Sequence, residues 1–217
     1  MMSDGPTNSI VEEAGYYWSN KMGRMYLLAL EEVVGKNAVN AILNQAGLRR
    51  RMNNYPPDNL DLGWEFGEVS AINQAQAQIY GPEEDVELAR RVGRAWFGHA
   101  LSDFAAVLGI ADLAFRLLPA GMRVKLGLKA IAATFRNTGD QTVRVQEREN
   151  SFQYRIERCP ECWGRRAEAS ICHTNLGLLQ EGLSWATGSR QAQVEERACI
   201  ARGDPSCTFV IAKHSIE

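Results

Sequence analysis

The chain has 217 residues, 45% of them hydrophobic and 23% charged, with a formal net charge of −2. It is long enough to bury a core, and its composition is that of an ordinary globular protein. The low net charge gives no electrostatic reason to expect nucleic acid or an anionic membrane as a partner. No apolar run reaches the roughly 18–20 residues that span a bilayer, and we predict no membrane span.

The first residues lack the basic and apolar regions of a signal peptide. The chain has five cysteines, and an odd number cannot be paired completely in internal disulfides. We therefore expect a cytoplasmic protein whose cysteines are free thiols or metal ligands.

Residues 1–137 have the apolar spacing of helices. A long helix is predicted from Pro82, because proline at the first position and the three acids after it suit a helix N-terminus. The arginine run 49–51 is most simply the solvated end of a helix, with an anion contact as the alternative. The other predicted helices cover 22–34, 38–46, 66–80 and 122–135.

After Thr138 the apolar period changes from 3.6 to 2, which predicts two strands near 143–146 and 152–157. A helix from Cys172 to Gly188 and two more strands follow, the strands at about 192–200 and 207–213. Short links between strands favour an antiparallel sheet. We predict one α+β domain over 1–217, in which a helical half packs on a four-stranded sheet of ββαββ order over 138–217.

Cysteines and one glutamate gather around the last predicted strands. Cys199 and Cys207 flank the turn 203–205, and Cys172 begins a helix, where the dipole favours a thiolate. With Glu196 they form a plausible tetrahedral site for a zinc-like ion. Glu196 and Cys199 point to opposite faces of a regular strand, so this site needs a bulge or a strand end between them. The alternative is that these cysteines are small buried hydrophobic residues.

Cys159 and Cys162 form a C-x-x-C pair, which fits a separate metal site, a four-cysteine site with Cys199 and Cys207, or plain packing. A redox pair is the weakest alternative, because the βαβ context of thioredoxin-like proteins is absent. His173 is a candidate ligand or a residue that supports one.

Standard catalytic motifs are absent from the sequence, including dinucleotide, phosphate-binding and serine-hydrolase patterns. We therefore assign no catalytic residue. Aromatic residues at helical spacing, with one on a facing strand, are candidates either for ordinary core or for an apolar ligand pocket between helices and sheet. They are Trp96, Phe97, Phe104, Phe115, Phe135 and Tyr154.

The C-terminal third carries a family resemblance in a pattern of about 40 residues. The pattern is Cys172-His173, Gly177, Gly182, Glu196-x-x-Cys199-Ile200-Ala201, Gly203-Asp204-Pro205, Cys207 and Phe209. It resembles the 4-vinyl reductase domain family. That family includes a protein linked to bacteriochlorophyll synthesis and the sensor domains of aromatic-responsive transcription activators.

The resemblance implies a fold similar to small subunits of vesicle-trafficking complexes, a homodimer, and a structural zinc ion held by Cys172, Glu196, Cys199 and Cys207. Cys159 and Cys162 are not part of that implied set. The expected function is a sensor or carrier that binds a small hydrophobic or aromatic molecule, such as a tetrapyrrole. The alternatives are a 4-vinyl reductase-type enzyme or accessory protein acting on a bacteriochlorophyll precursor, and a scaffold protein.

Overall fold

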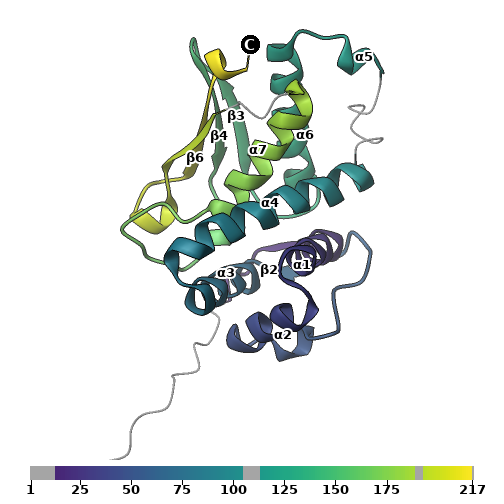
Figure 1. Cartoon of the computed structure of the whole chain (residues 1–217), viewed down its shortest axis with the longest axis vertical. Coiled ribbons are helices and arrows are strands. Elements are labelled where there is room, and N and C mark those ends of the chain that lie inside the picture. Colours follow the sequence, from purple (N-terminus) through teal and green to yellow (C-terminus); the bar gives the residue numbers. More distant parts are fainter. Residues whose placement is uncertain (1–12, 105–112, 189–192, 217) are drawn as a thin grey trace, which may run out of the picture.

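The computed structural model describes residues 13–104, 113–188 and 193–216 (Figure 1). Its helices are α1 (Asn20–Val34), α2 (Lys36–Gln45), α3 (Phe66–Tyr80), α4 (Pro82–Phe104), α5 (Leu113–Arg116), α6 (Ala120–Asn137) and α7 (His173–Thr187). Its strands are β1 (Tyr17–Ser19), β2 (Leu62–Glu65), β3 (Val143–Glu147), β4 (Ser151–Ile156), β5 (Val194–Ala198) and β6 (Cys207–Ala212). Short 3-10 helices are η1 (Arg49–Arg51), η2 (Pro160–Cys162), η3 (Ile200–Arg202) and η4 (Lys213–Ser215). The predicted α+β class is confirmed.

Helix boundaries follow the local signals in the sequence. The Ser19 hydroxyl accepts a hydrogen bond from the backbone N–H of Met22 and caps α1. Gly188, with φ of 76°, ends α7 in the left-handed conformation that glycine adopts without strain. As predicted, α4 begins at Pro82 and carries three acids in its first turn.

The C-terminal part contains an antiparallel four-stranded sheet of order β3-β4-β6-β5. Side chains alternate along the two central strands, so that one face is buried. Helices α6 and α7 lie beside this sheet (Figure 1). The predicted ββαββ order is therefore confirmed.

The N-terminal half also contains strands, which the helical assignment of 1–137 missed. β1 and β2 pair in antiparallel register, with Trp18 opposite Trp64. Strands of three and four residues are too short to show a period of two. Their pairing depends on the fold, since it brings together segments more than 40 residues apart.

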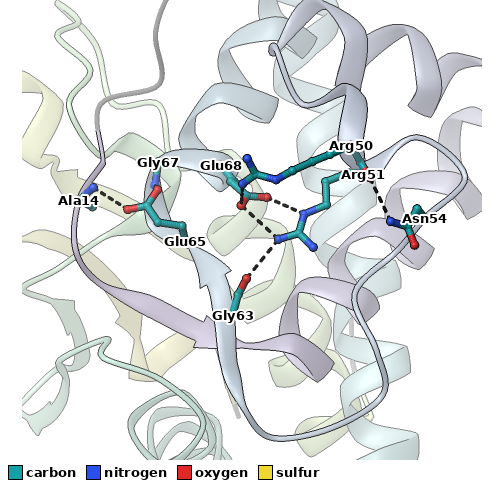
Figure 2. Close-up of polar contacts among 8 residues, drawn as sticks. All are labelled: Ala14, Arg50, Arg51, Asn54, Gly63, Glu65, Gly67 and Glu68. Carbon is teal, nitrogen blue, oxygen red and sulfur yellow. Dashed lines mark hydrogen bonds and ion pairs between the residues drawn. The ribbon is translucent and has the colours of Figure 1, made fainter.

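The arginine run 49–51 is the 3-10 helix η1, and Figure 2 shows where two of its side chains lie. Arg51 donates to both carboxylate oxygens of Glu68 on α3 at 2.9 and 3.1 Å, and Arg50 donates to the same carboxylate. Glu68 is buried, and Arg51 also donates to the Gly63 carbonyl. The anion contact is therefore with this chain's own Glu68, and the solvated helix end describes only the exposed Arg50.

Helix α4 lies between the α1–α3 layer and α7 (Figure 1). It crosses α7 at two glycines. A Cβ at Gly93 would lie 2.0 Å from the Thr174 carbonyl oxygen, and a Cβ at Gly177 would lie 2.1 Å from the Arg90 carbonyl oxygen. Only glycine permits this backbone approach, so the two positions fix how closely the helical half packs on α7.

Replacing Gly93 by alanine should lower the free energy of unfolding by about 3 kcal/mol, because the added methyl group meets backbone that cannot move aside. Gly98 on the same helix is the matched control, since a Cβ there meets nothing within 4 Å. Gly98→Ala should leave stability unchanged or raise it by up to about 1 kcal/mol. Urea unfolding measures both, and equal stabilities of the two variants would contradict the crossing.

Candidate metal centre and apolar cavity

All five cysteines are buried and meet where the C-terminal segments converge. Cys159 and Cys162 come from the loop after β4 and from η2, and Cys172 is the residue before α7. Cys199 follows β5, and Cys207 is the first residue of β6. The fold thus joins residues from four separate segments.

The sulfur atoms are spaced as ligands of one ion would be. Sγ of Cys172 lies 3.6 Å from that of Cys159, 3.8 Å from that of Cys199 and 3.6 Å from that of Cys207. Cys207 lies 4.0 Å from Cys199 and 3.4 Å from Cys162. Four thiolates at about 2.3 Å from a tetrahedral zinc ion would have their sulfurs about 3.8 Å apart. The spacing is far longer than a disulfide bond of about 2 Å.

Two overlapping groups of four have ligand atoms within 4.8 Å of one another. One is the predicted set, Cys172, Glu196, Cys199 and Cys207. The other is Cys159, Cys162, Cys172 and Cys207. The C-x-x-C pair therefore joins the cluster, a role that the sequence left open.

A register irregularity brings Glu196 to the cluster. The pairing of β5 with β6 shifts between Glu196 and Ala198, and Cys199 lies just beyond the strand end. The bulge or strand end that the predicted set required is confirmed. One carboxylate oxygen of Glu196 accepts from the Cys172 backbone N–H at 3.1 Å, and the other is buried without a hydrogen-bond partner among the described residues.

Burial sets the protonation of these groups. It raises the pKa of Cys159 to about 12 and raises the pKa of Cys172. Burial, with the charges of Cys199 and Glu161 nearby, raises the pKa of Glu196 to about 9. A cation would reverse this preference and displace the protons. The donor set of thiols and one carboxyl suits a soft divalent ion such as zinc.

Nearby N–H groups point at the sulfur and carboxylate atoms. The Ile200 backbone N–H donates to Cys207 Sγ at 3.4 Å, and the Asn175 side-chain amide donates to Cys159 Sγ at 3.8 Å. The Cys199 N–H donates to the Asp204 carboxylate at 2.9 Å, which holds the turn before β6. Donors to sulfur favour the thiolate form that binds metal.

Glu161, inside the C-x-x-C pair, has a role that sequence reasoning missed. Its carboxylate accepts from the backbone N–H groups of Thr174 and Asn175 at 2.6 and 3.0 Å, and from the Asn175 side chain. It therefore caps the start of α7, while its burial raises its pKa to about 8. No local signal reveals this cap, because Glu161 lies 13 residues from Thr174 in the chain.

His173 belongs to neither group of ligand atoms. Its Nδ1 is buried without a hydrogen-bond partner among the described residues. Burial, followed by the charges of Arg90 and Arg165, lowers its pKa to about 4, so the ring is neutral at physiological pH.

A second feature is an apolar cavity of about 40 Å³ among the helices. Four of the predicted aromatic residues line it: Trp96, Phe97, Phe104 and Phe135. Tyr154 is buried on β4 and does not line it, and Phe115 stacks on Trp185 with ring centroids 5.2 Å apart. The residues that sequence reasoning missed are Met22, Ala100, Leu101, Ile131, Thr134 and Leu178.

Comparison with known proteins shows the family. The profile of the 4-vinyl reductase domain matches residues 152–213, the segment that contains the cysteine cluster. The bacteriochlorophyll synthase 23 kDa chain of Cereibacter sphaeroides is 31% identical over 188 residues, which cover 83% of this chain and 82% of that protein. The chain belongs to the 4-vinyl reductase domain family. The predicted resemblance is therefore confirmed.

Solved structures similar to this chain are H-NOX proteins. The unliganded Fe(II) form of an H-NOX protein from K. algicida has a TM-score of 0.53, 15% identity, and covers 89% of this chain and 95% of that one. An H-NOX structure from work on heme distortion has a TM-score of 0.56, also at 15% identity, and covers 89% and 93%. At this identity the likeness shows a shared fold. Within the described ranges, we find no helix long and apolar enough to cross a membrane.

Proposed function

We propose that this chain is a sensor or carrier module that binds a small apolar or aromatic molecule in the cavity between α1, α4, α6 and α7. The cavity carries this proposal, because aromatic and aliphatic side chains from four helices converge on it. Family membership supports it, as does the fold shared with H-NOX structures whose descriptions name Fe(II) and heme.

The size and lining of the cavity indicate the class of ligand. A volume of about 40 Å³ is well below the roughly 300 Å³ of an ordinary ligand pocket. A small ligand therefore needs modest local expansion, and a tetrapyrrole needs a large one. Thr134 supplies the one hydroxyl in the lining, which already donates to the Ala130 carbonyl, and neither histidine nor cysteine is among the lining residues. Recognition would rest on apolar contact and shape.

The proposed structural partner of this cavity is a zinc ion bound by Cys172, Glu196, Cys199 and Cys207. Four protein ligands leave no open position for a substrate, so the ion would be structural. It would join the start of α7 to the β5–β6 connection. The support is the sulfur spacing, the bulge that turns Glu196 inward, and the unpartnered oxygen of Glu196.

Glu196→Gln should lower the metal content of the purified protein and its melting temperature, because the amide lacks the charge of the carboxylate ligand. Loss of a direct ligand should weaken metal affinity at least tenfold, since outer-shell changes alone cost about 10–100-fold. Glu195→Gln is the matched control on the exposed side of the same strand. Elemental analysis and calorimetry measure both, and full metal in Glu196→Gln would remove Glu196 from the ligand set.

Leu101→Trp should fill the cavity and weaken binding of a small aromatic probe. Toluene is the probe, followed by NMR chemical shifts of the lining residues. Binding to the unmodified protein should saturate, and Leu101→Trp should lower the affinity at least tenfold, or about 1.4 kcal/mol. Leu126→Trp, at an exposed position of α6, should bind toluene normally. Equal affinities of the two variants would place the ligand elsewhere.

A second candidate is an accessory protein or reductase for the 4-vinyl group of a bacteriochlorophyll precursor. The observation in its favour is the 31% identity with the bacteriochlorophyll synthase 23 kDa chain across most of both proteins. Reduction of a vinyl to an ethyl group adds two electrons and two protons, so this candidate needs an external reductant.

The two candidates differ in what a divinyl tetrapyrrole does. With divinyl protochlorophyllide as the probe, the sensor or carrier proposal predicts unchanged vinyl absorbance when dithionite or a nicotinamide reductant is added. The reductase predicts a blue shift of the absorbance only when protein and reductant are both present. That shift, absent from the protein-free control, would replace the sensor or carrier proposal by the second candidate.

A further inference from the structure

The two groups of ligand atoms share two members. Cys172 and Cys207 belong to both, Cys159 and Cys162 belong only to the four-cysteine group, and Glu196 with Cys199 makes up the rest of the other. Geometrically, two tetrahedra that share an edge have this arrangement, with two common vertices and two private vertices each.

From this arrangement we propose that the cluster holds two divalent metal ions, bridged by the thiolates of Cys172 and Cys207. One ion is completed by Cys159 and Cys162, and the other by Glu196 and Cys199. The inference rests on the metal clamp of the proposed function and adds a second ion to it. Zinc fits both positions, since it accepts tetrahedral sets of thiolates and carboxylates.

Distances around the shared edge support a bridge. The sulfurs of Cys172 and Cys207 are 3.6 Å apart. On one side Cys159 lies 3.6 Å from Cys172 and Cys162 lies 3.4 Å from Cys207. On the other side Cys199 lies 3.8 Å from Cys172 and 4.0 Å from Cys207. With bonds of about 2.3 Å to both bridging sulfurs, the two ions would be about 3 Å apart.

A single ion leaves polar groups of this cluster unsatisfied. An ion in the set with Glu196 leaves Cys159 and Cys162 as thiols, each 1% exposed, in contact with metal-bound sulfurs. An ion in the four-cysteine set leaves the buried oxygen of Glu196 without a partner among the described residues. Two ions use all six side chains, and buried polar groups normally have partners.

Charge balance also permits the second ion. One divalent ion with four anionic ligands has a formal charge of +2 − 4 = −2. Two ions with five thiolates and one carboxylate have +4 − 6 = −2. The second ion displaces the two thiol protons of Cys159 and Cys162, so the buried charge is unchanged and the cost of burying it does not double.

Metal stoichiometry tests the proposal on the full chain, purified under reducing conditions without added chelator and then equilibrated with zinc and desalted. Elemental analysis should give two zinc ions per chain. The double variant Cys159→Ser and Cys162→Ser should keep one, and Cys199→Ser should also keep one. Two ions retained by both variants would overturn the assignment of ligands.

Spectroscopy of the unmodified protein avoids any folding defect in the variants. After exchange with ¹¹³Cd, two cadmium signals with scalar coupling through the shared sulfurs are expected, and X-ray absorption of the zinc form should show a metal–metal distance of about 3 Å. One metal per chain, retained in the Cys159/Cys162 double variant, would overturn the second ion and leave the clamp of the proposed function intact. Absence of bound metal would overturn both.

Discussion

The close crossing of α4 and α7 is the constraint on which the rest of the structure depends. Gly93 and Gly177 let the two backbones touch, with no room for a Cβ at either position. This contact fixes α7 against the helical half, while α7 also packs against α6 and β5. Because one helix carries both contacts, the position of α7 relates the N-terminal helices to the cysteine cluster.

Both candidate sites use α7. Its N-terminal end adjoins Cys172 and receives the buried cap of Glu161, and further along the same helix Leu178 lines the apolar cavity. A metal-bound cluster would hold the start of this helix in place, since metal binding and folding are coupled at sites built from separate segments. The cavity wall would then be held by the same ions, which gives a physical reason for a structural metal in a ligand-binding module.

The comparisons and the geometry support different parts of this account. Family membership rests on sequence identity across most of the chain and on the domain match over 152–213, which contains the cluster but not the cavity-lining helices α1, α4 and α6. The H-NOX likeness spans both parts and shows their shared arrangement. The cavity depends on that arrangement, because its lining comes from four helices on both sides of the α4–α7 crossing.

The sequence by itself determined the local elements and the types of ligand. Periods of 3.6 and 2, proline at the start of α4 and glycine after α7 are local signals, so helices and sheet strands could be predicted within a few residues. The need for an irregularity between Glu196 and Cys199 also followed from strand geometry alone. Tertiary structure decided what lies far apart in the chain: the β1–β2 pairing, the Glu161 cap on α7, the approach of Cys159 and Cys162 to Cys172 and Cys207, and the size of the cavity. These depend on how elements pack, and residue spacing along a chain carries no information about the distances between elements that are remote in sequence.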